Sequence, residues 1–248
     1  MSSILVSLDG TTANCALEDY PADSNYPAAV TYTNGEVLAC GGYDLEDADR
    51  CWSFNGSAWS ALPNSKQKHC WHDSPNVLIN DGWWVTGRNG SCSRKTSTSD
   101  VYTGSNWKPG PALPGRWKEY PEHSCVVNLN TTHTFLIGGG YPITDYAWMY
   151  DWSSQAWART GSLIQGRRVN GCVSLCGQGI LVAGGLFGRD KVYTVELYDP
   201  TQGTWSSQPD LSRDIDPYSP LFLNWDGQVL ALFHKEDQIY KRSEENGK

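Results

Sequence analysis

GILVAGGLFGRDKVYTVELYDPTQGTW, residues 179–205, combines three features that a single β-hairpin would not need together. An apolar run ends at Gly184-Gly185, an alternating Val/Leu/Tyr segment follows, and a turn leads to Trp205. Alternation predicts a half-buried strand, and Asp-Pro-Thr-Gln-Gly has the composition of a turn. Because glycine has no Cβ, the pair allows the chain to turn and another sheet to come close. The stretch therefore predicts three successive strands packed against a neighbour.

The same pattern occurs four times along the chain. The tryptophans, at spacings of 48, 50 and 48 residues, are Trp59, Trp107, Trp157 and Trp205. The apolar strands that precede them end in glycine, at Gly41, Gly87, Gly139 and Gly184. A further aromatic stands seven residues before three of the tryptophans, as Trp52, Tyr150 and Tyr198, and five before the remaining one, as Tyr102. With a first strand such as residues 171–176, each copy predicts four short strands.

Repeated four-stranded units of about 45–50 residues are typical of propeller blades. First and second strands can be counted five times, near residues 27–42, 69–87, 123–140, 169–185 and 218–234. The last unit lacks a Trp-bearing fourth strand, while residues 3–17 contain surplus strand-like segments. We expect an all-β chain, a single propeller domain over residues 1–248, with five blades and the last one closed by strands from both termini. Six blades, one of them built from residues 4–17 and the tail, is the alternative.

The Gly-Gly pairs, the Tyr198-Asp-Pro step and the spaced tryptophans resemble the kelch-repeat family. The surroundings of Cys15, Cys40 and Cys51 are also similar to those in secreted, cysteine-containing kelch proteins of invertebrates. Arg88 departs from this pattern in place of a second glycine, and so does Phe233-His234 in place of Gly-Gly. The resemblance implies a kelch-type β-propeller. Some members of the family are enzymes, including copper radical oxidases, but the residues here do not assign their ligands.

Composition and charge narrow the class of partner. The 12 Trp, 13 Tyr, 25 Gly and 13 Pro favour strands and turns and leave little room for helix. A formal net charge of −8 argues against nucleic acid as the main partner. No apolar run approaches the roughly 20 residues that span a bilayer, and the start of the chain has no signal-peptide pattern.

The eight cysteines show no zinc-type C-x-x-C spacing, and three glycosylation sequons accompany them, at Asn55, Asn89 and Asn130. Together they favour a secreted protein over a cytosolic one with eight buried thiols. We expect a disulfide between Cys40 and Cys51, because a tight hairpin would place them opposite each other at bridging distance. A bond between Cys125 and Cys172 would link the first strands of adjacent blades. The other pairings stay open.

In a propeller the loops after the second and fourth strands emerge on one face. Cations and aromatics recur in these loops. The cations are Lys66, Arg116, Arg167, Arg168 and Arg213, and the aromatics are Tyr43, Trp117, Tyr141 and Phe187. On an acidic protein they predict a docking surface for a carboxylate or an acidic segment. The alternative for each arginine is a structural role, as a brace between blades.

Two further clusters favour a structural interpretation. Residues 44–49 carry four carboxylates but lack the glycine and terminal glutamate of a calcium loop, so a solvated loop is favoured. In His69-Cys70-Trp71-His72 a strand would send the two histidines to opposite faces, which favours a packed blade edge over a metal site.

No nucleophile motif such as Gly-x-Ser-x-Gly is present, and no cofactor or metal is predicted. The sequence favours a non-catalytic secreted module that binds a protein, peptide or glycan. Two alternatives are a carbohydrate-active or metal-dependent enzyme that uses the channel mouth, and a structural or ligand-storing extracellular protein.

Overall fold

The computed structural model describes residues 20–21, 28–42, 48–69, 76–80, 82–86, 98–115, 123–218, 220–225, 228–233 and 236–241. Every regular element in these residues is a β-strand, which confirms the all-β expectation. The chain divides into two compact units, Met1–Leu113 and Pro114–Lys248. The single-domain organisation stays a prediction.

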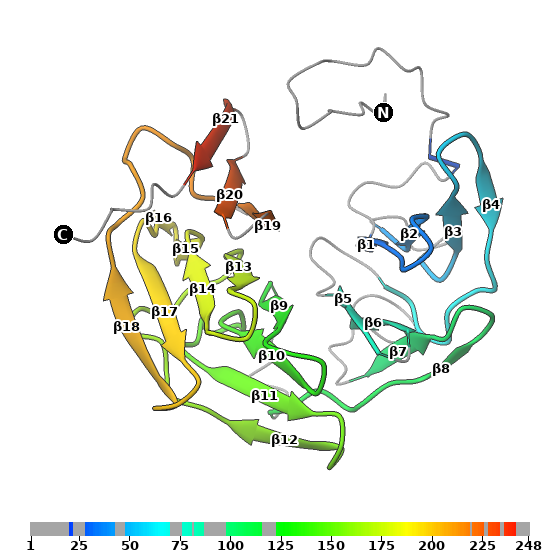
Figure 1. Cartoon of the computed structure of the whole chain (residues 1–248), viewed down its shortest axis with the longest axis horizontal. Coiled ribbons are helices and arrows are strands. Elements are labelled where there is room, and N and C mark those ends of the chain that lie inside the picture. The colour runs from blue at the N-terminus through cyan, green and yellow to red at the C-terminus, as the bar shows by residue number, and fades with distance from the viewer. Residues whose placement is uncertain are drawn as a thin grey trace. The chain divides into compact units, whose positions relative to one another are not determined.

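The first unit contains two antiparallel sheets in which consecutive strands are neighbours (Figure 1). The first sheet is formed by β1 (Ala28–Thr31), β2 (Val37–Cys40), β3 (Cys51–Phe54) and β4 (Trp59–Ala61). The second sheet is formed by β5 (Asn76–Ile79), β6 (Gly82–Thr86), β7 (Ser99–Tyr102) and β8 (Trp107–Pro109). Their first strands, β1 and β5, lie against each other.

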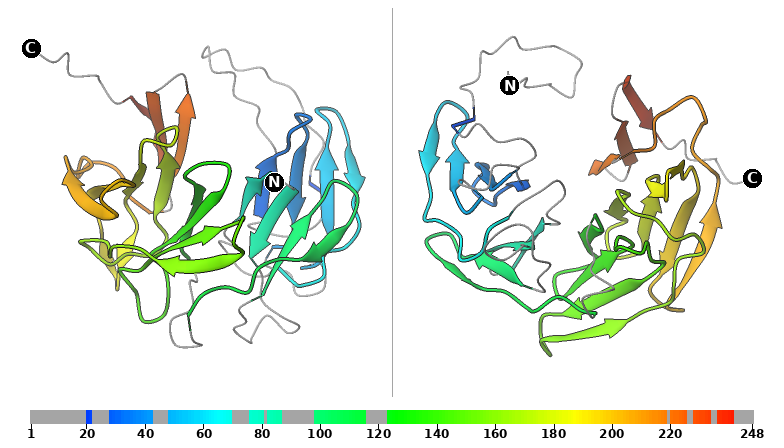
Figure 2. Two further views of the ribbon diagram at one scale, coloured as in Figure 1. Left: turned by 60° about the horizontal axis from the view of Figure 1, so that its bottom comes forward. Right: turned by 180° about the vertical axis from the view of Figure 1, so that it is seen from behind.

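The second unit contains three larger sheets and a small hairpin (Figure 2). The third sheet has β9 (Cys125–Asn128), β10 (His133–Ile137), β11 (Ala147–Asp151) and β12 (Ala156–Arg159). The fourth has β13 (Gly171–Ser174), β14 (Ile180–Ala183), β17 (Val195–Asp199) and β18 (Thr204–Gln208). The loop that connects β14 to β17 contains the hairpin of β15 (Leu186–Phe187) and β16 (Asp190–Lys191). The fifth has β19 (Leu221–Trp225), β20 (Gln228–Phe233) and β21 (Glu236–Lys241). The first strand β13 lies against both β9 and β19.

The four-stranded meanders are the blades that the repeat predicts. The fifth sheet has three strands among the residues that the structure describes. Residues 1–19, which would supply its closing strand or part of a sixth blade, lie outside the described residues. Closure by both termini and the choice between five and six blades therefore stay predictions.

A cross-strand aromatic pair marks the third and fourth strands of each four-stranded sheet. In the second unit Tyr198 pairs with Trp205, with ring centroids 5.1 Å apart. In the first sheet the residue opposite Trp59 is Phe54, at 5.1 Å, and not Trp52, which lies opposite Ala61. The seven-residue spacing therefore does not mark the partner of Trp59, because the β3–β4 turn is as short as the turn in the second sheet.

The glycine pair at the end of the second strand makes room for a neighbouring loop. Gly184 and Gly185 both have a positive φ, of 70° and 94°. The N–H of Gly185 donates to the carbonyl of Pro217 at 2.7 Å, and a Cβ on Gly184 would stand 2.6 Å from that same oxygen. Pro217 belongs to the loop that leaves the fourth strand of this sheet. The same bond joins Gly139 to the carbonyl of Arg167 at 2.7 Å.

The fourth-strand tryptophan connects its sheet to the preceding one. The indole N–H of Trp205 donates to the carbonyl of Gly161 at 2.9 Å, in the loop that follows β12. In the first unit the N–H of Trp107 donates to the carbonyl of Pro63 at 2.8 Å, in the loop that follows β4. These bonds explain why a tryptophan recurs at this position, since its large ring can pack on Tyr198 while its N–H reaches the next sheet.

Two disulfides are present among the described cysteines. Cys40 and Cys51 lie directly opposite each other on β2 and β3 and are bonded, which confirms the expected pair. Cys125 and Cys172 are bonded as well and join β9 to β13, the first strands of adjacent sheets. Cys15, Cys70 and Cys92 lie outside the described residues.

Candidate functional site

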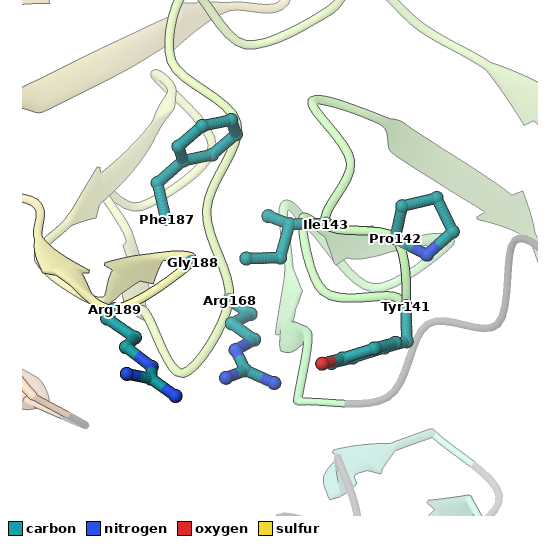
Figure 3. Close-up of a pocket in the computed structure, with 7 residues that line it drawn as sticks. All are labelled: Tyr141, Pro142, Ile143, Arg168, Phe187, Gly188 and Arg189. Carbon is teal, nitrogen blue, oxygen red and sulfur yellow. The ribbon is translucent and has the colours of Figure 1, made fainter.

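The second unit contains a hollow at the loop ends of its third and fourth sheets. Its volume is about 510 Å³. The residues that line it come from the β10–β11 loop, the loop after β12 and the β15–β16 hairpin; they are Tyr141, Pro142, Ile143, Arg168, Phe187, Gly188 and Arg189 (Figure 3). These are the loops after second and fourth strands, where the sequence predicted a docking surface.

The β15–β16 hairpin gives the hollow one of its walls. Its two-residue loop is Gly188-Arg189, and Gly188 has a φ of 67° that favours glycine. The backbone of Arg168 exchanges two hydrogen bonds with Leu186, of 2.9 and 2.8 Å, which holds the loop after β12 against this hairpin. Backbone hydrogen bonds therefore fix the positions of Arg168, Phe187 and Arg189 relative to one another.

Apolar rings and cations share this surface. Tyr141 is 64% exposed and Phe187 is 48% exposed, both high for large apolar side chains. The guanidinium of Arg168 lies 5.5 Å from the centroid of the Tyr141 ring, which is within cation–π range. Exposed aromatics next to guanidinium groups are the residue types that dominate binding hot spots.

Arg167 does not contribute to this surface, because its side chain is fully buried. Its guanidinium donates to the carbonyl of Thr194 at 2.8 Å and to the carboxylate of Glu196 at 2.6 Å. Glu196 also accepts the backbone N–H of Ile164 at 2.6 Å. Burial lowers the pKa of Arg167, while the charge of Glu196 opposes that effect. Of the two roles open to Arg167, the structure supports the brace and corrects its placement in the docking surface.

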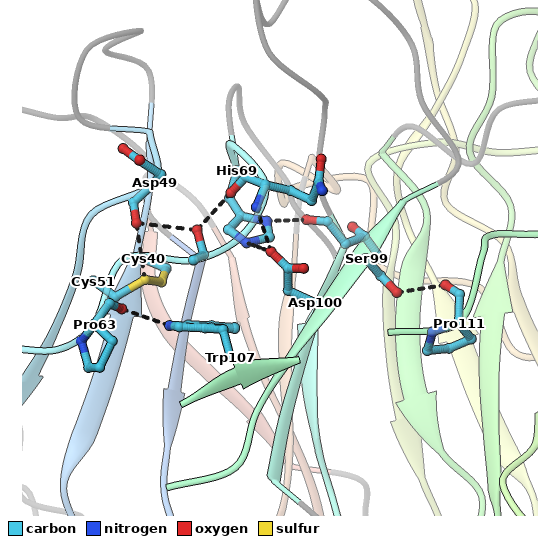
Figure 4. Close-up of polar contacts among 12 residues, drawn as sticks. Cys40, Asp49, Cys51, Pro63, His69, Ser99, Asp100, Trp107 and Pro111 are labelled. Atoms are coloured by element: carbon cyan, nitrogen blue, oxygen red, sulfur yellow. Dashed lines mark hydrogen bonds and ion pairs between the residues drawn. A yellow bond between two sulfur atoms is a disulfide. The ribbon is translucent and has the colours of Figure 1, made fainter. Parts of the chain in front are cut away.

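His69 stands in the first unit at the sequence position that Arg167 holds in the second, and Figure 4 shows it beside Asp100. Both residues stand ten positions after a fourth-strand tryptophan, and both are buried. The Nδ1 of His69 is 2.8 Å from the carbonyl of Thr86, and its Nε2 is 3.5 Å from the carboxylate of Asp100. Asp100, like Glu196, stands two residues before the third-strand tyrosine and accepts a loop N–H, that of Gln67. His69 is therefore part of a packed sheet edge, and Cys70 and His72 lie outside the described residues.

Two further predicted binding residues that the structure describes, Arg213 and Lys66, do not line the hollow. Arg213 is exposed and lies over the ring of Tyr193, 4.4 Å from its centroid. Lys66 is exposed on a loop of the first unit. Tyr43, Arg116 and Trp117 lie outside the described residues, so their roles stay predictions.

Pro142, Ile143 and Arg189 line the hollow and were not among the predicted residues. A signal for Arg189 was present, because Gly188-Arg189 lies between Leu186-Phe187 and Asp190-Lys191 as a two-residue hairpin loop would. For Pro142 and Ile143 the sequence offers no such signal.

Two of the three sequons lie in turns, each at the end of its own sheet that is opposite to the loops after the second and fourth strands. Asn55 lies in the β3–β4 turn and Asn130 in the β9–β10 turn, and both are exposed. The side-chain carbonyl of each accepts a hydrogen bond from the backbone N–H two residues later, at 3.0 and 2.9 Å. Asn89 lies outside the described residues. Whether any of the three carries a glycan stays a prediction.

The described residues contain neither a metal-binding cluster nor a membrane-spanning helix. No group of three or more His, Cys, Asp or Glu side chains there could hold a metal ion. The same residues include no helix that is long and apolar enough to cross a membrane.

Residues 167–212 match the kelch motif, a span that includes Gly184-Gly185, Tyr198 and Trp205. The chain therefore contains a kelch motif. It is 31% identical over 121 residues to the F-box/kelch-repeat protein SKIP30 of Arabidopsis thaliana, covering 43% of this chain and 34% of that protein. It is 29% identical over 124 residues to Kelch-like protein 35 of Mus musculus, covering 48% of this chain and 21% of that protein. The chain spans about a third or less of the length of these two relatives. The finer likeness to secreted invertebrate kelch proteins stays a prediction.

Proposed function

We propose that this chain is a non-catalytic binding module that holds a polypeptide partner on the loops around the hollow. The observation that carries this proposal is the exposed apolar surface of Tyr141, Phe187 and Ile164, which come from three neighbouring loops of the second unit. Large apolar side chains that stay exposed together are typical of interaction sites. The kelch repeats themselves are consistent with a protein-binding role.

Pre-organisation supports the proposal. The loop after β12 is bonded through its backbone to Gly139 at 2.7 Å and to Leu186 at 2.9 Å. Loops that are already fixed lose little conformational entropy when a partner binds, so more of the contact energy appears as affinity. A glycan is the less favoured partner, because Pro142, Ile143 and Phe187 give one wall of the hollow an apolar surface, which suits an apolar peptide side chain better than a sugar edge lined with hydroxyls.

Phe187→Ala is expected to weaken a bound peptide at least about tenfold, because a buried aromatic anchor contributes about 1–2 kcal/mol or more at an interface. The test starts from a random peptide library displayed on phage and panned against the immobilised chain. Enriched peptides are then titrated against Phe187→Ala and Tyr141→Ala by fluorescence polarisation. Gln202→Ala is the matched control, since Gln202 is exposed in the turn at the opposite end of the same sheet. Failure to enrich peptides, or equal binding by Phe187→Ala and Gln202→Ala, would contradict the proposal.

We also propose that the protein matures in an oxidising, secretory environment. Two features support this: the Cys40–Cys51 and Cys125–Cys172 disulfides, and the exposed sequons at Asn55 and Asn130. A glycan at Asn130 would lie at the end of the third sheet opposite to the β10–β11 loop, which lines the hollow. Mass spectrometry of protein from its natural source would reveal such a glycan, and unmodified asparagines together with free thiols at these four cysteines would contradict secretion.

A further inference from the structure

Two guanidinium groups line the hollow, and neither has an acidic partner among the residues that the structure describes. Arg168 and Arg189 lie side by side, and the hydroxyl of Tyr141 is directed toward Arg168 (Figure 3). Among the described residues no carboxylate lies within 4.0 Å of either group, whereas the neighbouring Lys191 is paired with Asp216 at 3.2 Å. The Nε of Arg168 is buried and makes no hydrogen bond to a described residue. Two unneutralised cations at one place favour a ligand with more than one negative charge or several acceptor oxygens.

The rest of the hollow is shaped for an apolar group. A volume of about 510 Å³ lies in the range of pockets that hold organic ligands, and it exceeds what a bare oxyanion fills. Phe187, Ile143 and Pro142 form the wall away from the two guanidinium groups. Aromatic rings prefer to pack on other rings edge-on or offset, and Phe187 is exposed for such a contact. A complementary ligand therefore has a flat apolar body and an anion at one end.

We propose that the hollow recognises a tyrosine side chain of the partner peptide that carries a tetrahedral oxyanion, as an O-phosphate or an O-sulfate ester. The proposal rests on the proposed function, because it names the residue that the polypeptide partner places in this hollow. The ester oxygens accept hydrogen bonds from both guanidinium forks and from Tyr141, and the aryl ring packs on Phe187. A phosphate ester carries about −1.5 to −2 charges at neutral pH, which matches two arginines better than the single charge of Glu or Asp.

The test uses oriented peptide libraries with degenerate flanking positions, so that no single sequence context decides the result. The fixed central residue is tyrosine, O-phosphotyrosine, O-sulfotyrosine or glutamate, and each fluorescein-labelled library is titrated by polarisation. We expect at least one ester library to bind about tenfold or more tighter than the tyrosine and glutamate libraries. The tighter of the two esters identifies the source of the oxyanion. Inorganic phosphate alone, as competitor, is expected to displace the ester library only weakly.

Arginine variants connect that preference to the hollow. The double substitution Arg168→Gln with Arg189→Gln is expected to abolish the tenfold preference for the ester, while the melting temperature stays close to that of the unsubstituted chain. Arg213→Gln removes an exposed cation elsewhere in the same unit and is the matched control. Equal binding of the ester, tyrosine and glutamate libraries would overturn the inference, as would an ester preference that survives the double substitution. Displacement by phosphate as strong as by the peptide would refute the aromatic part.

The results distinguish a failure of this inference from a failure of the proposed function. If peptide binding depends on Phe187 but not on the ester or on the two arginines, the binding-module proposal stands and only the oxyanion proposal is wrong. Absence of any Phe187-dependent peptide would remove the binding module itself.

Discussion

Arg167→Ala is expected to lower the free energy of unfolding by about 3–5 kcal/mol, the range measured when one partner of a buried ion pair is removed. Glu196 is 1% exposed and accepts a hydrogen bond of 2.6 Å from the guanidinium of Arg167. Without the guanidinium, a buried carboxylate would keep only the backbone N–H groups of Ile164 and Gln165. Urea denaturation of the full chain, followed by tryptophan fluorescence, measures the loss.

Arg168→Ala is the matched control for this prediction, because the neighbouring side chain is only partly buried and makes no ion pair with a described residue, so the substitution is expected to change stability by less than about 1 kcal/mol. Adding Glu196→Gln to Arg167→Ala should recover part of the loss, since the uncompensated charge is then gone. If Arg167→Ala leaves stability unchanged but weakens peptide binding, Arg167 is a binding residue and its role as a structural brace is contradicted.

Removing the Cys125–Cys172 disulfide is expected to cost about 4 kcal/mol, against about 3 kcal/mol for Cys40–Cys51, by the loop-entropy relation. The sequence separations are 47 and 11 residues, so the first bond restricts the unfolded chain more strongly. The double variants Cys125→Ala with Cys172→Ala, and Cys40→Ala with Cys51→Ala, are compared by urea denaturation without reductant.

The unsubstituted chain with reductant serves as the reference, because it lacks both bonds. A larger loss for the Cys40–Cys51 variant would mean that native contacts outweigh loop entropy here. Equal stability of all three oxidised proteins would show that neither disulfide restricts the unfolded chain.

The fold was largely predictable because each blade follows from local signals. The strands β13, β14, β17 and β18 were predicted from alternation, Gly184-Gly185 and the Asp199 turn. That turn is closed by Asp199, whose side chain accepts hydrogen bonds from the hydroxyl and N–H of Thr201, and these lower the pKa of Asp199. The exception was Phe54, which was missed because Trp52 fits the seven-residue spacing equally well in sequence and only the strand register separates the two.

The candidate site was less predictable because the residues that form it come from loops of two different blades. The loops were located correctly from the repeat, and Tyr141, Arg168 and Phe187 do line one hollow. Arg167 and Arg168 are adjacent in sequence, yet one is buried against Glu196 and the other borders the hollow. Nothing local separates them, since the acid that selects Arg167 lies 29 residues further along the chain.

The bond from the second glycine to the loop after the fourth strand has a consequence for how such a chain can diversify. Its acceptor is a main-chain carbonyl, and the residues that supply it are as different as His69, Arg167 and Pro217. Every amino acid carries that group, so a substitution in the loop can change what the surface recognises without withdrawing the contact that holds the loop in place. New specificities can therefore arise here one side chain at a time on an unaltered scaffold.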